Sequence, residues 1–331
     1  MTKIAINGFG RIGRMATRAI FERKLPLEIV AINDLAAPKL LAHLFQFDST
    51  FGEFAGEVSA DENSITIDGV KIPVFSERDP ENLDLKKVDI VLECTGIFRN
   101  REKMEKHLRA GATRVILSAP AKGEIDGTFV MGVNHENFHP EKHFLISNAS
   151  CTTNCLAPVA KVLDEIFSIE RGIMTTIHSF TGDQRLLDAP HRDFRRARAA
   201  TTSMIPTTTG AARAVGLVLP RLNGKLNGLA IRVPTPNVSL VDLSVELSRE
   251  VSADEINAAL EKAARGKLSG ILRVEHRPLV SHDFLKSPFS SIVDAPSTMT
   301  IGKMAKILAW YDNEWGYSNR LVDLAVFVGE K

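Results

Sequence analysis

The sequence has little of what marks secreted, membrane-spanning or strongly charged proteins. Only three of its 331 residues are cysteines, at positions 94, 151 and 155. Three cysteines are too few for a disulfide framework, so we expect a reducing, cytoplasmic compartment. Lys and Arg number 41 against 40 Asp and Glu, a net charge of +1 that gives no global field for nucleic acid or anionic membranes.

Other absences narrow the class of protein further. No apolar run is long enough to cross a bilayer, and the first residues already resemble a strand, so we expect no signal peptide. The spaced pair Cys151 and Cys155 has no second cysteine pair to complete a zinc site, so no metal is expected. Hydrophobic residues make up 44% and charged residues 24%, an ordinary globular balance, and the length suggests about two domains at roughly 150 residues each.

The hydrophobic pattern changes near residue 150. The first half alternates short apolar strands with helical segments, which favours a parallel sheet with crossover helices. The expected strands are residues 3–7, 27–33, 88–94 and 114–118, and the expected helices are 14–22 and 101–110. Later strands alternate apolar and polar residues, as in a mostly antiparallel sheet with one covered face. These follow a helix ending near residue 167 and occupy residues 173–179, 226–233, 238–247 and 307–310.

A glycine-rich turn follows the first strand. Gly8, Gly10 and Gly13 have the G-x-G-x-x-G spacing directly before a helix, the context in which this motif binds a dinucleotide pyrophosphate at a helix N-terminus. Asp34 ends the second strand, where a carboxylate accepts hydrogen bonds from ribose hydroxyls and repels a 2′-phosphate. The sequence therefore predicts a Rossmann-type domain that prefers NAD to NADP. A glycine turn that binds no nucleotide is the alternative.

One cysteine and one histidine are candidates for covalent catalysis. Cys151 lies at a predicted helix start, where N–H groups and the helix dipole lower a thiol pKa. Cys155 lies one turn further on and is interpreted as a packing residue, and Pro158 should bend the helix. His178 ends a strand and is the candidate general base. Two core cysteines and an ordinary polar histidine are the alternative.

Two segments of the second half are suited to anions. The run TTTGAA at residues 207–212 starts a predicted helix with hydroxyls and N–H groups, and Arg232 lies near the end of a strand. Five arginines also cluster between residues 185 and 198. Acidic residues interrupt that cluster, so nucleic acid is not expected as its main ligand.

Several motifs together resemble phosphorylating glyceraldehyde-3-phosphate dehydrogenases over nearly the whole chain. They are INGFGRIGR at 6–14, ASCTTNCLAP at 149–158, TTIH at 175–178, RRARAA at 195–200, RVPT at 232–235 and WYDNEWG at 310–316. The resemblance implies that residues 1–150 with 315–331 form the NAD-binding domain and residues 151–314 an α+β catalytic domain. It also implies a homotetramer, with the loop at residues 181–206 near a neighbour's cofactor site.

The resemblance further implies a reaction of glycolysis and gluconeogenesis. D-glyceraldehyde 3-phosphate, NAD and inorganic phosphate would give 1,3-bisphosphoglycerate through a thiohemiacetal and a thioester on Cys151, with His178 as base. The implied phosphate-binding residues are Ser150, Thr152, Thr181, Arg196, Thr209, Gly210 and Arg232. The implied cofactor-binding residues are Gly8, Gly10, Arg11, Ile12, Gly13, Asp34, Arg78, Ser118 and Asn313.

One departure from the family pattern bears on the cofactor. Bacterial members that use NAD usually have Asp-Leu-Pro where this chain has Asp188-Ala189-Pro190, and photosynthetic members that accept NADP have Ala-Ser. NAD is favoured, with dual use left open. The rival hypotheses are an erythrose-4-phosphate dehydrogenase, which the TGD and TTTG runs at 181–183 and 207–210 disfavour, a semialdehyde dehydrogenase, and a binding protein with a secondary role.

Overall fold

The computed structural model describes all 331 residues, and the chain forms two compact units. Unit 1 comprises Met1–Phe129, His135–Ala149 and Ser318–Lys331, and unit 2 comprises Val130–Asn134 and Ser150–Tyr317. Residues 130–134, Ser150 and residues 315–317 lie in unit 2, whereas the predicted division places them in the NAD-binding domain. None of the helices has both the length and the apolar content that a membrane crossing needs.

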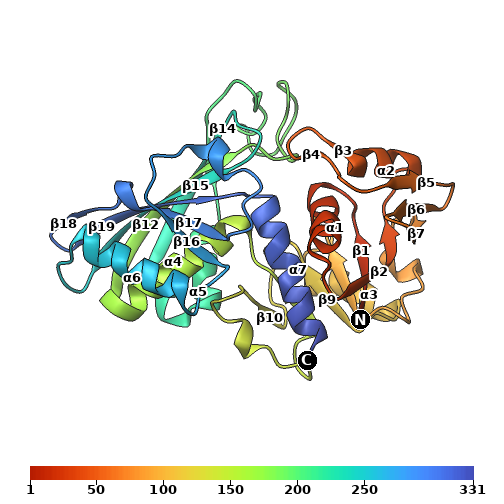
Figure 1. The fold of residues 1–331 in the computed structure, drawn as a ribbon, viewed down its shortest axis with the longest axis horizontal. Helices are drawn as coiled ribbons and strands as arrows, with labels where there is room; N and C mark the ends of the chain where they lie inside the picture. The colour runs from red at the N-terminus through yellow and green to blue at the C-terminus, as the bar shows by residue number, and fades with distance from the viewer. The chain divides into compact units, whose positions relative to one another are not determined.

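Unit 1 is built on a nine-stranded sheet in the order β10-β11-β9-β8-β1-β2-β7-β6-β5 (Figure 1). The pairs from β10 to β7 are parallel, and β7, β6 and β5 pair antiparallel. Its strands are β1 (Thr2–Asn7), β2 (Leu27–Asn33), β5 (Val58–Ala60), β6 (Ser64–Ile67), β7 (Val70–Phe75), β8 (Ile90–Glu93), β9 (Arg114–Leu117), β10 (Gly127–Thr128) and β11 (Leu145–Ser147). A separate pair consists of β3 (Phe47–Asp48) and β4 (Gly52–Glu53).

Helices make the crossovers of this parallel sheet. They are α1 (Arg11–Arg23), α2 (Pro38–Gln46) and α3 (Arg101–Arg109). The central strands are buried along most of their length, as in parallel sheets covered on both faces. From residue 318 onward the C-terminal helix α7 (Trp315–Gly329) belongs to this unit, where Asn319 and Asp323 accept hydrogen bonds from Arg23 at the end of α1.

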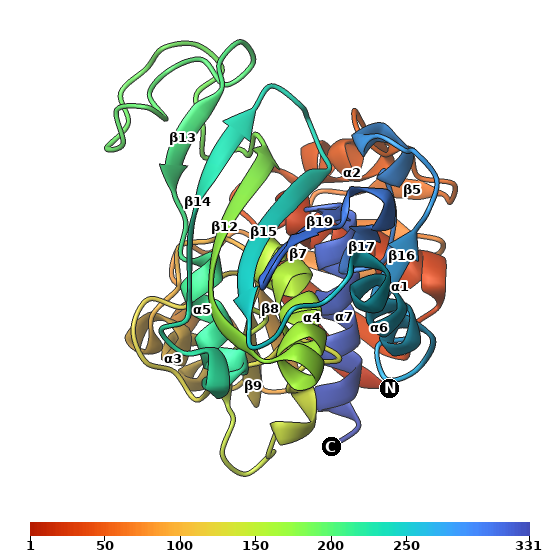
Figure 2. The same ribbon diagram turned by 90° about the vertical axis from the view of Figure 1, so that its left-hand side faces the viewer.

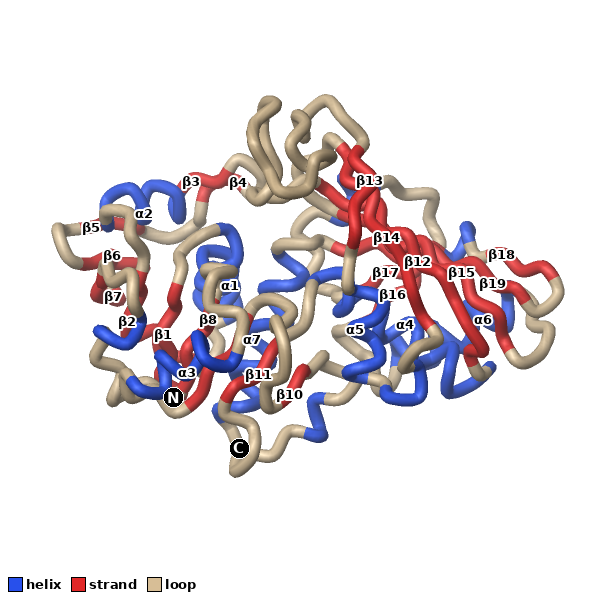
Figure 3. Tube along the Cα trace, turned by 180° about the vertical axis from the view of Figure 1, so that it is seen from behind, coloured by secondary structure: helices blue, strands red, loops and turns tan.

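Unit 2 contains a mixed sheet in the order β13-β14-β12-β15-β19-β17-β16, with β18 paired to β19 (Figure 2). Only β12 with β14 and β16 with β17 are parallel, so the predicted fold class, a parallel Rossmann-type sheet plus a mostly antiparallel one, is confirmed. The strands are β12 (Ile169–Ser179), β13 (Ile205–Thr208), β14 (Leu226–Val233), β15 (Ser239–Leu247), β16 (Leu272–Glu275), β17 (Ser291–Asp294), β18 (Met299–Ile301) and β19 (Met304–Tyr311). Figure 3 shows the long loop that joins β12 to β13.

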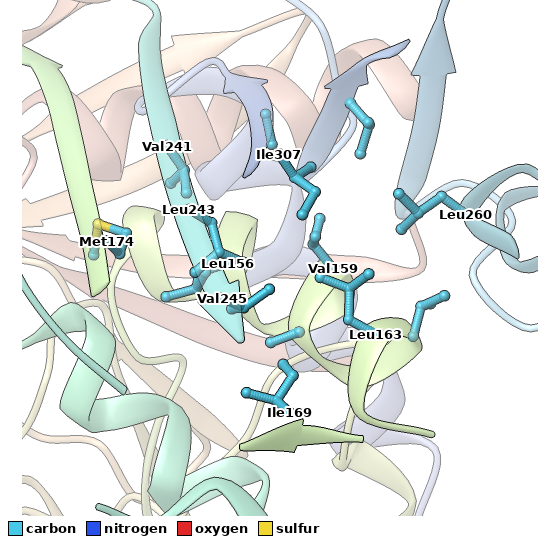
Figure 4. Close-up of a cluster of buried hydrophobic side chains, with 14 of the residues drawn as sticks. Leu156, Val159, Leu163, Ile169, Met174, Val241, Leu243, Val245, Leu260 and Ile307 are labelled. Atoms are coloured by element: carbon cyan, nitrogen blue, oxygen red, sulfur yellow. The ribbon is translucent and has the colours of Figure 1, made fainter. Parts of the chain in front are cut away.

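The core of unit 2 lies between this sheet and three helices. These are α4 (Cys151–Phe167), α5 (Ala211–Val218) and α6 (Ala253–Arg265). In Figure 4, Leu163 of α4 lies among other apolar side chains of the cluster. The helices contact strands of this sheet, buried residues alternate with half-buried ones along β15 and β19, and Ile173 and Ile301 are exposed. The sheet is therefore covered on one face by its own chain.

Truncating Leu163 tests this packing. Leu163 is fully buried in the core cluster, so Leu163→Ala should lower the free energy of unfolding by about 2–5 kcal/mol. Both tryptophans, Trp310 and Trp315, belong to unit 2, so denaturant titration followed by tryptophan fluorescence reports on this unit. Ile166→Ala, on the exposed side of the same helix, is the matched control and should change stability by no more than about 0.5 kcal/mol. Equal losses in the two variants would contradict this account of the core.

Candidate functional site

The glycine turn of unit 1 is held by close backbone packing. Gly8 has a φ of +92°, and a Cβ there would lie 2.7 Å from the Thr95 backbone nitrogen. A Cβ on Gly13 would lie 2.3 Å from the Gly8 carbonyl oxygen. A Cβ on Gly10 would meet no protein atom, and Gly10 caps α1 without a side chain of its own. The first-turn N–H groups of α1 are therefore suited to a pyrophosphate, and the turn fits a dinucleotide.

Asp34 is fixed against this turn. Its Oδ2 accepts a hydrogen bond from the Phe9 backbone N–H at 2.8 Å, and its Oδ1 accepts one from Ala36 at 3.0 Å. Each carboxylate oxygen keeps a further lone pair for ribose hydroxyls. The place and orientation of this carboxylate suit an adenosine ribose.

The other predicted cofactor residues of unit 1 have varied surroundings. Arg11 and Ile12 lie in the first turn of α1, where the Arg11 guanidinium is paired with Asp48, so backbone N–H groups are what this segment offers to a ligand. Arg78 is exposed, and Ser118 is half-buried with its side chain hydrogen-bonded to Cys94.

Cys151 is the first residue of α4 in unit 2. Ser150 caps this helix, its Oγ accepting a hydrogen bond from the Thr153 N–H at 3.0 Å. The helix continues past Pro158 to Phe167. Cys155 is fully buried, and its thiol hydrogen-bonds within the core, so its interpretation as a packing residue is confirmed. Capping by Ser150 sets the position of the Cys151 side chain at the helix end.

The structure brings Cys151 and His178 together. The Cys151 Sγ lies 3.5 Å from His178 Nε2, and His178 Nδ1 lies 2.6 Å from the Ser179 carbonyl oxygen. Because a carbonyl only accepts, we assign the imidazole proton to Nδ1. Nε2 is then the unprotonated nitrogen and faces the thiol as a proton acceptor, the arrangement that a general base requires.

Both groups are neutral in this environment. Burial raises the pKa of Cys151, although the positive charge of Arg232 works in the opposite direction. Burial is the main cause that lowers the pKa of His178, and the charge of Arg232 is the second; the pKa falls to about 3. The prediction of a lowered Cys151 pKa is therefore wrong for the chain alone: the sequence shows the helix N-terminus but not the desolvation that outweighs it.

Strand register places Arg232 beside the base. β12 and β14 run parallel with His178 opposite Arg232, and Arg232 Nη1 lies 3.1 Å from His178 Nδ1. Arg232 Nη1 also donates to the Thr181 hydroxyl at 3.0 Å and to the Ser179 carbonyl at 3.2 Å. The Nε of Arg232 is buried without a hydrogen-bond partner. A largely buried guanidinium with an unused donor is a strong anion-binding group.

Arg196 provides a second cation close to this group. Its Nη1 donates to Asp183 at 2.7 Å and its Nε to the Thr207 hydroxyl at 3.1 Å, while the Thr181 hydroxyl also donates to Asp183. Although burial opposes it, the Thr181 hydrogen bond and the charges of Arg232 and Arg196 lower the pKa of Asp183. The carboxylate of Asp183 is thus an anion of the chain itself that interacts with both Arg196 and Arg232.

The remaining predicted phosphate residues fall into two groups. Thr209 and Gly210 precede α5, whose cap Gly210 has no side chain, and Thr209 Oγ1 accepts a hydrogen bond from Ala211 at 3.2 Å. Thr152 is different, because it is buried and its hydroxyl is hydrogen-bonded to Tyr311 at 2.8 Å. Its hydroxyl is therefore already occupied. The predicted helix start at residue 207 is also corrected, since 205–208 form β13 and α5 begins at Ala211.

Tyr311 and Asp183 are site residues that sequence reasoning missed. Tyr311 is buried, hydrogen-bonds Thr176 at 2.9 Å as well as Thr152, and lies edge-on to His178 with ring centres 6.0 Å apart. It directly follows the predicted strand at 307–310, inside the WYDNEWG run, where nothing in the local pattern separates a site residue from a core residue.

The fold and the site define a class of protein. A Rossmann-type unit with a dinucleotide turn, together with a unit carrying a thiol, a base and clustered cations, is the composition of a nicotinamide-dependent aldehyde dehydrogenase that works through a cysteine.

Comparison with known proteins gives the particular family. The model for "Glyceraldehyde 3-phosphate dehydrogenase, NAD binding domain" matches residues 2–101, and that for the C-terminal domain matches residues 150–313. The glyceraldehyde-3-phosphate dehydrogenase of Geobacillus stearothermophilus is 59% identical over 332 residues, covering 99% of this chain and 98% of the relative. That of Zymomonas mobilis is 57% identical over 328 residues, covering 98% and 97%. The chain belongs to the glyceraldehyde-3-phosphate dehydrogenase family, and the predicted NAD cofactor is confirmed at the level of the family.

The charge of Arg232 should be measurable at the thiol. A positive charge favours the thiolate, so Arg232→Gln should move the pH profile of Cys151 alkylation by iodoacetamide to higher pH. Cys94 and Cys155 should not compete, because burial raises their thiol pKa values to about 12. Arg171→Gln, at the opposite end of β12, is the matched control and should leave the profile in place. An unchanged profile in Arg232→Gln would rule out this electrostatic role.

Proposed function

We propose that this protein oxidises D-glyceraldehyde 3-phosphate with NAD and inorganic phosphate to 1,3-bisphosphoglycerate. The observation that carries the proposal is the contact between Cys151 Sγ and His178 Nε2 at 3.5 Å, with Arg232 in contact with the same imidazole. A thiol and a base perform acyl chemistry, and a half-buried cation beside them selects a substrate that carries an anionic group.

Cys151 and His178 carry the covalent steps. The thiol sulfur attacks the aldehyde carbon while His178 Nε2 takes the thiol proton and passes it to the former carbonyl oxygen, giving a hemithioacetal and a neutral imidazole. Bound NAD supplies the hydride acceptor. Loss of the carbinol proton through His178 and of hydride from carbon leaves a thioester on Cys151. A phosphate oxygen then attacks the thioester carbonyl, the C–S bond breaks, and the thiolate regains the proton.

Two groups of residues would hold the two phosphates. Thr181 and Arg232 would bind the phosphate of the substrate, and the unpartnered Nε of Arg232 supports this assignment. Ser150, Thr209, Gly210 and Arg196 would bind the attacking phosphate. An anion on Arg232 also offsets the charge that lowers the pKa of His178, so substrate binding would strengthen the base.

We further propose a homotetramer. Several exposed apolar side chains of unit 2 lie on its sheet and on its long loop, and they include Ile173, Leu187, Phe194 and Ile301. Apolar surface of this kind marks an interface, and another copy of the chain is the simplest occupant. Sedimentation of the purified protein as a monomer would contradict this. A cytoplasmic location remains a prediction from the few cysteines.

Phosphate dependence is the decisive test of the reaction. With D-glyceraldehyde 3-phosphate and NAD, we expect NADH formation, followed by its absorbance, to need inorganic phosphate for sustained turnover. Cys151→Ser should abolish it, and His178→Asn should lower kcat by about 10²–10⁴-fold, the usual contribution of a general base. Cys155→Ser removes a thiol one turn away and should remain active, which controls for loss of thiol as such.

Other outcomes would redirect the assignment. Turnover that ignores phosphate would indicate thioester hydrolysis and favour erythrose 4-phosphate as the substrate to test next. Absence of turnover with either NAD or NADP would reject the reaction and favour a binding role for the chain.

Asp34 should control the choice between NAD and NADP. Its carboxylate repels a 2′-phosphate, so Asp34→Asn should lower the ratio of kcat/KM for NAD over NADP by about tenfold, corresponding to about 1.4 kcal/mol. Asn keeps an oxygen that can accept one of the two backbone hydrogen bonds made by Asp34. Asp84→Asn, which removes an exposed carboxylate elsewhere in unit 1, is the control for a general loss of negative charge. If the ratio is unchanged in Asp34→Asn, residues other than Asp34 discriminate between NAD and NADP.

A further inference from the structure

The side chain of Asn313 has one end used and one end unused. Asn313 is 5% exposed, and its Oδ1 accepts a hydrogen bond from the Ser239 hydroxyl at 2.8 Å. Its Nδ2 has no hydrogen-bond partner within the chain. With Oδ1 used by Ser239, the NH₂ donor is the part of the Asn313 side chain left for a ligand atom.

Ser239 determines which end of the amide is used. Its Oγ accepts a hydrogen bond from the Ser179 backbone N–H at 3.1 Å. A backbone N–H only donates, so the single proton of the Ser239 hydroxyl is directed to another acceptor, and Asn313 Oδ1 is that acceptor. The hydroxyl thereby fixes the orientation of the amide, which would otherwise be free to rotate by 180°.

The backbone that carries Asn313 is also held. The carboxylate of Asp312 is buried and accepts hydrogen bonds from Asn237 Nδ2 at 2.8 Å, from the Lys286 N–H at 2.8 Å and from the Trp315 N–H at 2.7 Å. The amide of Asn313 is thus fixed by Ser239 and its main chain by Asp312. Such support from surrounding residues is what holds a binding group within the tolerance that a reaction needs.

Ser179, whose N–H donates to Ser239, also orients the base. Ser179 uses its carbonyl to hold His178 Nδ1 and its N–H to hold Ser239, which holds Asn313. β12 and β15 pair antiparallel with Ile177 opposite Leu240, which places Ser179 and Ser239 at neighbouring strand ends. A continuous hydrogen-bonded chain therefore joins the proton acceptor to the Asn313 amide.

We propose that Ser239 is a positioning residue that sets the polarity of Asn313, so that its NH₂ group faces the carbonyl oxygen of a nicotinamide carboxamide. The proposal rests on the proposed function, together with the role that the family resemblance implies for Asn313, which is contact with the cofactor at that carboxamide. A carbonyl oxygen accepts and cannot donate, so only this orientation of the Asn313 amide forms the contact. Ser239 thereby contributes to recognition of the nicotinamide end of the cofactor without contacting the cofactor itself.

Calorimetric binding of NAD and of ADP-ribose separates this role from damage elsewhere. ADP-ribose lacks the nicotinamide, so Ser239→Ala should weaken NAD by about tenfold, the value of one hydrogen bond, and leave ADP-ribose unchanged. Ser239→Thr keeps the hydroxyl and should bind NAD like the original protein. Asn313→Ala should show the same selective loss, and the double variant Ser239→Ala/Asn313→Ala should bind NAD no more weakly than Asn313→Ala alone.

The outcomes distinguish failure of this inference from failure of the proposed function. If Ser239→Ala weakens NAD as much in the Asn313→Ala background as in the original protein, the effect does not pass through Asn313 and the inference is overturned. It is also overturned if Asn313→Ala weakens NAD and Ser239→Ala does not. If the original protein binds neither NAD nor ADP-ribose, or if Asn313→Ala leaves NAD binding unchanged, the assigned cofactor contact itself fails.

Discussion

The hydrogen bond between His178 Nδ1 and the Ser179 carbonyl determines the chemistry that the catalytic unit can perform. It commits the imidazole proton to Nδ1 and leaves Nε2 to face the thiol of Cys151. With the other tautomer, Nε2 would carry the proton and could not receive one from sulfur. Ser150 caps the helix that carries Cys151, and the strand register places Arg232 opposite His178. Both features contribute to the chemistry only because the lone pair of Nε2 already points to the sulfur.

Desolvation and charge compete at this pair, and Arg232 acts on both members. Its positive charge favours the thiolate of Cys151 and disfavours the imidazolium of His178, so it promotes the loss of the proton from sulfur and opposes its arrival on nitrogen. Burial then keeps both groups neutral. An anion placed on Arg232 removes the opposition at nitrogen while the helix N-terminus continues to favour the thiolate. In the proposed reaction, recognition of an anionic substrate and activation of the base would thus both depend on one guanidinium.

Much of the fold and part of the site could be predicted from the sequence because they rest on local signals. The bounds of β2 and β14 are those expected from their apolar runs. The glycine turn could be predicted because backbone contacts at Gly8 and Gly13 exclude a side chain, so the fold requires glycines at these positions of the sequence. The direction of the Cys151 pKa shift was not predictable, because desolvation depends on residues distant in sequence. The same holds for Thr152, whose hydroxyl faces Tyr311 from 159 positions away. Hydrogen-bond partners that come from strand pairing leave no trace in local spacing.

Stability and chemistry occupy different parts of the same elements in unit 2. The apolar residues of α4 beyond its first turn form the core with the sheet, while the first turn carries Cys151. Likewise β12, β15 and β19 place core residues along their length and His178, Ser239 and Tyr311 at neighbouring ends, with Ser239 opposite Tyr311 in register. Polar groups at strand ends can satisfy one another without interrupting the ladder or the core. A rigid sheet therefore fixes the relative positions of the base and of the groups that orient it, because every one of them is tied to a strand end that the core already holds.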